Sequence, residues 1–189
     1  MTHTTTAQRL EAPAVQIRGC VKCPLYASRT VAVPGDGKPS AKVMIIGEAP
    51  GKEEDASGHP FVGAAGRFLN QVLAGSGLSR KDLFITNIVK CRPSGNRPPK
   101  KGEIDTCTAH YLFEQMTLLN PQLIMLLGGV AAKTLLNSTR IAEARGRIIE
   151  RGGRRYLVGY HPAAKFYRAD LGAKVAEDFA TLVREMKKV

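Results

Sequence analysis

Short apolar runs alternate along the chain with longer segments in which apolar residues recur every three or four positions. Three of these runs are rich in aliphatic residues and are predicted to be strands, at 41–47, 82–89 and 122–128. The last, "QLIMLLG", is unbroken in its apolar part, which is typical of a strand buried on both faces. Two more extended segments are expected near 146–150 and 154–158.

Helical spacing is clearest in "FVGAAGRFLNQVLAGSGL", where Phe68, Leu69, Val72 and Leu73 share one face and glycines follow. Three other segments are predicted to be helical, at 103–119, 130–136 and 171–187. Because strands and helices alternate along the chain, we expect an α/β fold. Its mainly parallel sheet would be covered by helices on both faces, which is a three-layer α/β/α sandwich.

The chain is predicted to form a single domain over residues 1–189. Residues 1–16 are polar and rich in threonine, and we expect them to be flexible. Residues 17–40 and 90–107 carry the cysteines and are expected to form a lobe on one side. The stretch "VPGDGKPSA" within that lobe is predicted to be a loop, not a strand. Another long loop is expected at 48–61.

The charge of the chain indicates a polyanionic partner. There are 28 Lys and Arg against 16 Asp and Glu, which gives a formal charge of +12 and a pI near 9.8. Nucleic acid is the commonest such partner, although a solvated basic surface is the alternative. No secretory leader or transmembrane run is present. We therefore expect a cytoplasmic protein without membrane contact, associated with the nucleoid in a prokaryote.

Four cysteines indicate a metal centre. Cys20 and Cys23 form a C-x-x-C pair, whose sulfurs can reach one metal, and Cys91 and Cys107 lie far along the chain. Disulfides are rare in the cytosol, and a redox C-x-x-C would follow a strand in a βαβ unit. A zinc ribbon would show a second close pair, whereas an iron–sulfur cluster accepts sulfurs from separate segments. The residues alone leave zinc and iron–sulfur open.

Polar residues follow three predicted strands, within "GEAPGKEED", "TNIVKCRP" and "GYHPAAKFYR". The exits of parallel strands converge at one sheet edge, so Glu48, Asn87 and His161 are expected to share a pocket. Each also has a structural interpretation: Glu48 as a helix-end charge, Asn87 as a loop anchor and His161 as a packed side chain. Their coincidence at one edge favours a binding site.

These residue types suit recognition and release of a nucleobase. The Asn87 amide offers a donor and an acceptor side by side, which complement O4 and N3–H of uracil and not the reversed pattern of cytosine. Phe61 is a candidate stacking surface, with a core aromatic as the alternative. His161 could donate a hydrogen bond to an oxygen that gains charge as a leaving group departs.

The segments "GEAPGKEEDASGHPFVGAAGRFL", "TNIVKCRP" and "YHPAA", together with the four cysteines, closely resemble family 4 uracil-DNA glycosylases from Cys20 to the C-terminus. The resemblance implies a central four-stranded parallel sheet. It implies hydrolysis of the N-glycosidic bond of deoxyuridine in DNA, which releases uracil and leaves an abasic site for base excision repair. It also implies a structural [4Fe–4S] cluster on Cys20, Cys23, Cys91 and Cys107.

The resemblance assigns roles in the pocket as well. Catalytic roles fall on His161, which faces uracil O2, and on Glu48. The uracil-binding residues would be Gly47, Glu48, Ala49, Phe61, Asn87 and His161. Ala49 stands where the best-known family of the superfamily has an Asp that positions water, so a backbone oxygen or Glu48 would take that role. The loop "KCRPSGNRPPKKGE" lacks the His of a covalently coupling branch, and no covalent product is expected.

DNA contacts are expected from the loops around this pocket. In "AAKFYR", Phe166 could fill the gap left by a flipped base, or Lys165 could clamp phosphate. The predicted DNA-contacting residues are Lys165, Phe166, Arg168, Arg92 and Arg97. We expect Glu53, Glu54 and Asp55 to hold the acidic loop in shape.

The leading hypothesis is thus a monofunctional uracil-DNA glycosylase. It would act as a monomer on single- or double-stranded uracil-containing DNA, with a sliding clamp as a possible partner. The alternative is a non-enzymatic iron–sulfur or zinc nucleic-acid-binding module. A Mg²⁺-dependent nucleotide hydrolase is disfavoured because no Walker signature is present.

Overall fold

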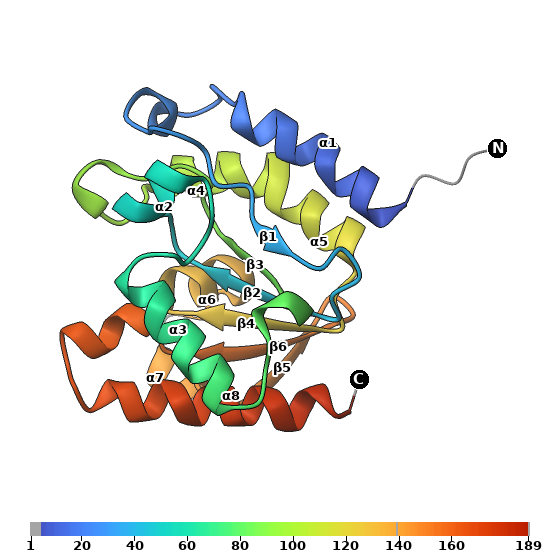
Figure 1. Ribbon diagram of the computed structural model, residues 1–189, viewed down its shortest axis with the longest axis vertical. Coiled ribbons are helices and arrows are strands. Elements are labelled where there is room, and N and C mark those ends of the chain that lie inside the picture. Colours follow the sequence, from blue (N-terminus) through green and yellow to red (C-terminus); the bar gives the residue numbers. More distant parts are fainter. Residues whose placement is uncertain (1–4, 139, 189) are drawn as a thin grey trace.

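A computed structural model describes residues 5–138 and 140–188, and its centre is a sheet with helices on both faces (Figure 1). The sheet has six strands in the order β1-β3-β2-β4-β6-β5. Their bounds are Asp36–Gly37 (β1), Val43–Gly47 (β2), Phe84–Asn87 (β3), Leu123–Leu127 (β4), Ile148–Arg151 (β5) and Arg154–Gly159 (β6). The strands β3, β2, β4 and β6 are parallel, as expected, but the expected total of four strands is wrong because an antiparallel strand is added at each edge.

The two edge strands have different origins. β5 and β6 form a hairpin around Gly152 and Gly153, which both have positive φ (56° and 72°). β1 lies within "VPGDGKPSA", which the sequence predicts to be a loop, and it pairs with β3. A Cβ on Gly37 would lie 1.9 Å from the Leu83 carbonyl oxygen. Glycine therefore allows the close approach that makes this segment a strand, although its composition is that of a turn.

Eight α-helices and several 3-10 turns connect the strands within the described residues. The helices are Thr6–Arg18 (α1), Lys52–Ser57 (α2), Ala64–Gly75 (α3), Lys101–Cys107 (α4), Phe113–Leu119 (α5), Gly129–Leu136 (α6), Ile141–Ala144 (α7) and Leu171–Met186 (α8). A π-helical turn, Thr108–Leu112, joins α4 to α5, so the helix expected at 103–119 is continuous but locally widened. No helix in these described segments is long and apolar enough to span a membrane.

Alternate side chains of the inner strands pack into two separate cores. On one face, Met44 and Ile124 contact the cluster that includes α1, α5 and α6. On the other, Ile45 and Met125 contact the cluster that includes α3 and α8. Figure 1 shows these helices on opposite sides of the sheet. The three-layer α/β/α expectation is therefore confirmed.

Helix α1 corrects the expectation of a flexible segment at 1–16. The side chain of Thr5 accepts a hydrogen bond from the Gln8 N–H and caps the helix. Leu10, Pro13 and Ile17 are buried in the core that α5 also lines. These residues are three and four positions apart, which is the spacing of one helix face. The composition of the segment is polar, and composition alone does not show this spacing. Residues 1–4 lie outside the described part of the chain.

Candidate active site and cysteine cavity

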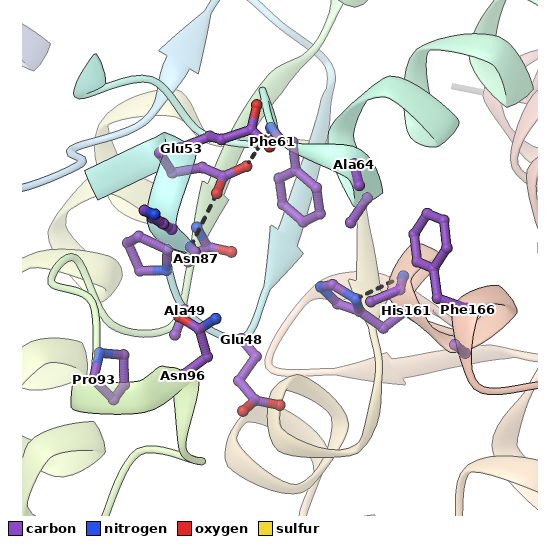
Figure 2. A pocket seen from close by; sticks show the side chains of 18 of the residues that line it. Glu48, Ala49, Glu53, Phe61, Ala64, Asn87, Pro93, Asn96, His161 and Phe166 are labelled. Atoms are coloured by element: carbon purple, nitrogen blue, oxygen red, sulfur yellow. Dashed lines mark hydrogen bonds between the residues drawn. The ribbon is translucent and has the colours of Figure 1, made fainter. Parts of the chain in front are cut away.

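The carboxyl ends of β2, β3 and β6 open into a cavity of about 620 Å³ (Figure 2). This volume is typical of small-molecule sites. The cavity brings together five of the six predicted uracil-binding residues, namely Glu48, Ala49, Phe61, Asn87 and His161. Gly47, also predicted, lies at the end of β2 beneath them. A Cβ there would come within 2.5 Å of both the Asn87 Oδ1 atom and the Phe61 ring, so only glycine fits.

Asn87 ends β3 with its side chain 1% exposed. Its Oδ1 atom is buried and has no hydrogen-bond partner among the described residues. A buried acceptor of this kind costs about 1–3 kcal/mol when it stays unpaired. The side chain lines the cavity, so a ligand that donates a hydrogen bond there would recover this free energy.

Phe61 is held in an uncommon backbone conformation, with φ at +53°. The Arg80 guanidinium fixes it by donating hydrogen bonds to the Phe61 carbonyl oxygen at 3.0 Å and to the Pro60 carbonyl oxygen. A Cβ on Gly66 would lie 1.9 Å from the same Phe61 oxygen, which shows how closely α3 approaches. The ring centroid lies 5.5 Å from that of His161. Phe61 is therefore a preformed platform at the wall of the cavity.

His161 follows β6, and its hydrogen bonds define its tautomer. The Ala163 N–H donates to His161 Nδ1 at 3.1 Å, so the proton of a neutral ring is on Nε2 (Figure 2). Burial lowers the pKa of His161 to about 4, and a nearby Glu54 charge offsets this only slightly. The imidazole is thus neutral at pH 7, with Nε2–H available as a donor.

Glu48 is half-buried, and burial raises the pKa of its carboxyl group. No described side chain or backbone N–H donates to that carboxylate. The backbone carbonyl oxygens of Gly47 and Glu48 already accept from the N–H groups of Ile88 and Val89, at 2.9 and 3.2 Å. Two groups were suggested for holding water, a backbone oxygen and the Glu48 side chain. Of these, the Glu48 carboxylate accepts fewer hydrogen bonds within the protein. The side chain of Ala49, next to it, has no polar atom.

The acidic residues that follow act as braces, as the sequence indicated. Glu54 accepts from the N–H groups of Val62 and Gly63, at 2.9 and 2.8 Å, and from that of Gly51 at 3.1 Å. Asp55 accepts from the Thr30 N–H at 2.9 Å. These bonds join the loop after β2 to the start of α3 and to the cysteine-bearing lobe.

The predicted DNA-contacting residues fall into two groups. Phe166, 54% exposed, and Arg97 line the cavity. The other three lie outside its lining, and each has a neighbour: Lys165 Nζ is 3.8 Å from the Phe68 ring centroid, Arg168 pairs with Asp170, and Arg92 donates to Asn96. DNA contact by any of them stays a prediction.

Tyr167 and Asn96 are among the lining residues that were missed from the sequence. Tyr167 is 88% exposed at the cavity mouth, and nothing in "AAKFYR" separates it from its neighbours. Asn96 has a left-handed backbone, with φ at +56°. The dipeptide Gly95-Asn96 between prolines is a turn signal, and it could have identified this loop as one with a defined backbone conformation.

The Cys20–Cys23 pair, Cys91 and Cys107 come from three segments and line one small cavity beside Lys90 and Tyr111. Cys91 and Cys107 are 6% and 7% exposed, and Cys20 and Cys23 are partly exposed. Burial raises the pKa of the thiols of Cys23 and Cys91, and that of Cys107 to about 11. The Arg29 guanidinium donates to the Cys91 sulfur at 3.1 Å and to the Cys20 carbonyl oxygen at 2.7 Å. This cation would stabilise a thiolate.

Comparison with known proteins places the chain in a family. A model of the uracil DNA glycosylase superfamily matches residues 34–187. The chain is 42% identical over 173 residues to the Type-4 uracil-DNA glycosylase of Archaeoglobus fulgidus, covering 87% of this chain and 86% of that protein. It is 41% identical over 175 residues to the Type-4 enzyme of Pyrobaculum aerophilum, covering 87% and 88%. It is 41% identical over 187 residues to that of Sulfurisphaera tokodaii, covering 94% and 84%. The chain therefore belongs to the uracil DNA glycosylase superfamily, and its resemblance to the type-4 members is confirmed.

Proposed function

We propose that this protein is a monofunctional uracil-DNA glycosylase, which hydrolyses the N-glycosidic bond of deoxyuridine in DNA. The observation that carries the proposal is the buried, unpartnered Oδ1 atom of Asn87, in one cavity with the Phe61 platform and the Nε2–H donor of His161. The target nucleotide would enter this cavity by flipping out of the helix, which is cheapest for a mispaired or single-stranded base.

Uracil selection rests on the Asn87 amide. Oδ1 accepts the uracil N3–H, and Nδ2 donates to O4. Cytosine presents an unprotonated N3 and an amino group, so it would face acceptor with acceptor and donor with donor. Stacking on Phe61 contributes about 1–3 kcal/mol for any base and holds it in register. Recognition is thus divided between a general platform and a specific edge.

Bond cleavage uses His161 and Glu48. The C1′–N1 bond breaks with its electron pair going to uracil, and His161 Nε2–H donates to the O2 atom that gains charge. One such donor typically contributes about 3–4 kcal/mol to lowering the barrier. The oxygen of a water molecule then bonds to C1′, and the Glu48 carboxylate takes its proton. The burial that raises the pKa of Glu48 makes it a better base for this step.

The DNA backbone would run past the cavity mouth. Phe166 and Tyr167 are exposed there, and either aromatic ring can fill the space left by a flipped base. Arg92, Arg97, Arg168 and Lys165 would approach phosphates on either side. The overall charge of +12 supports attraction to the DNA polyanion.

The four residues that would hold a [4Fe–4S] cluster, Cys20, Cys23, Cys91 and Cys107, line one cavity. A single zinc ion needs four ligands around one centre, with sulfurs about 4 Å apart. A cluster accepts sulfurs spaced more widely, and hydrogen bonds such as that from Arg29 to Cys91 are typical of its surroundings. When bound, it would link three segments of the chain covalently without redox chemistry in base removal.

The test is base release from an oligonucleotide with a single uracil, read as strand breaks after alkali. We expect breaks at uracil with the wild type, also in EDTA. The Asn87→Asp variant should be about 100-fold slower on uracil, because its carboxylate cannot donate to O4 and leaves that oxygen facing an acceptor. Asn137→Asp, at an exposed helix end away from the cavity, is the matched control.

Intact strands with ample wild-type protein that still binds DNA would favour the non-enzymatic binding module instead. Wild-type kinetics in the Asn87→Asp variant would overturn the edge-reading role while leaving the glycosylase activity standing.

A further inference from the structure

Lys90 is the one lysine buried in the described part of the chain, with an exposed fraction of 1%. Lysine is almost never fully buried unless its ammonium group is paired, because removing the charge from water is costly. Here the Nζ atom donates to the Thr86 Oγ1 atom at 2.6 Å and to the Asn87 carbonyl oxygen at 2.8 Å. Both acceptors belong to the last two residues of β3, where the base-reading side chain emerges.

The same network extends to segments on both sides of β3. Thr86 Oγ1 donates onward to the Pro34 carbonyl oxygen at 3.0 Å, and Gln115 Nε2 donates to that oxygen at 2.8 Å. The Lys90 carbonyl oxygen accepts from the Val33 N–H at 2.7 Å. Lys90 thus ties the β3 exit to the segment leaving the cysteine-bearing lobe, and through Pro34 to α5.

Lys90 also lines the cysteine cavity, and it is next to Cys91 in sequence. The chain therefore passes from the uracil-reading Asn87 to a cysteine ligand in four residues, with Lys90 between the two sites. A network of this type fixes backbone direction: the Asn87 carbonyl oxygen is held, so the Cα–Cβ bond of Asn87 is aimed as well.

We propose that Lys90 is a positioning residue for base selection, which acts by holding the backbone of Asn87 so that its amide faces the uracil edge. The proposal rests on the glycosylase function proposed above and deepens it. A misplacement of about 1 Å can lower the rate of an enzyme on the order of 100-fold. A small shift of the Asn87 backbone would therefore change the preference for uracil over cytosine.

The experiment compares Lys90→Met, which is unbranched and one atom shorter and removes the charge and the donors, with the wild type. Binding is measured to one oligonucleotide carrying 2′-fluoro-deoxyuridine, 2′-fluoro-deoxycytidine or an abasic tetrahydrofuran residue, none of which is readily cleaved. We expect the preference for the uridine over the cytidine analogue to fall about tenfold or more, while tetrahydrofuran affinity stays within about twofold. Melting temperature and the absorption of the cysteine centre report on folding.

Thr86→Val provides a second variant, because it removes one Lys90 acceptor and leaves the lysine buried. It should lower the same preference by a smaller factor, whereas Thr117→Val, whose exposed hydroxyl bonds only within its own helix, should not. An unchanged preference in folded Lys90→Met overturns the proposal, and if that variant does not fold, an unchanged preference in Thr86→Val does so. A wild type that itself shows no preference would refute the edge-reading role of Asn87 on which this proposal rests, and failure to release uracil would refute the proposed function, so the failures are distinguishable.

Discussion

At the scale of single residues, the chemistry of the site depends on neighbours that no motif names. His161 is a neutral Nε2–H donor because the Ala163 N–H occupies Nδ1 and burial lowers the ring's pKa to about 4. Phe61 is a platform because Arg80 holds its carbonyl oxygen in a left-handed turn. The residue type determines which chemistry a side chain is capable of. The neighbouring residues determine its protonation state and its conformation.

The protonation of His161 leads to a pH prediction. The folded pKa of about 4 lies below the unfolded value of 6.5, so the folded protein binds fewer protons between these values. His161 therefore contributes stability that is complete above pH 6.5 and is lost as the pH falls through about 4. The rate of uracil release should show no histidine inflection near pH 6.5 and should fall toward pH 4, as measured in single-turnover assays. An inflection near neutral pH that His161→Gln removes would contradict this.

The Arg80 contact predicts a variant that affects substrate binding. Arg80→Met should release the Pro60 and Phe61 carbonyl oxygens, so that the ring is less well held before the base arrives. We expect a KM increase of roughly tenfold with a smaller change in kcat, because stacking acts in the bound state as well as in the transition state. Lys81→Met, which removes an exposed positive charge next to it, is the control. Equal kinetics in the two variants would show that Phe61 does not need the brace.

At the scale of elements, the segment between β2 and α3 has a defined conformation, which hydrogen bonds hold in place. The sequence predicts a long loop at 48–61, and the structure places the short helix α2 within it. A helix of six residues has too few turns to show periodicity, and it is stabilised by partners outside itself. Glu54 provides them by binding Gly51 at one end of α2 and Val62 and Gly63 beyond the other.

This brace predicts a loss of stability. Glu54→Ala should lower the free energy of unfolding by about 2–3 kcal/mol, because charge-assisted bonds to three buried or partly buried N–H groups are lost. Urea denaturation would measure the change. Glu53→Ala, which breaks only an exposed pair with Arg67, should be close to neutral. A similar loss in both variants would mean that the acidic run stabilises the loop by charge alone.

At the scale of the whole molecule, the segment that follows β3 connects two sites. The cysteine cavity and the base cavity are joined by the segment that runs from Asn87 through Lys90 to Cys91, and by the loop that carries Asn96. Loss of the proposed cluster should therefore disturb the DNA-facing loops before it disturbs the sheet, because the parallel strands are packed on both faces by separate cores.

The metal centre leads to a prediction for the intact protein. Freshly purified wild type should absorb broadly near about 400 nm, as iron–sulfur proteins do. Cys107→Ala should lose this absorption, melt at a lower temperature and lose uracil release. A colourless wild type with one bound zinc would overturn the cluster, and unchanged melting in Cys107→Ala would overturn its structural role.

Much of the fold and most of the base pocket could be predicted from the sequence because both depend on local patterns. Apolar spacing identified the parallel strands and the helices α3, α6 and α8, and turn-rich strand exits pointed to Glu48, Asn87 and His161. The four cysteines, for which the sequence predicts one metal centre, line one cavity.

Only the tertiary structure decided the features that depend on distant partners. β1 exists because β3 offers it hydrogen bonds, and α1 is ordered because α5 receives its three apolar side chains. The tautomer of His161, the strained turn at Phe61 and the burial of Lys90 under Asn87 depend in the same way on the surrounding fold. Periodicity records which face of a segment is apolar, but a hydrogen bond between segments depends on where the folded chain brings them.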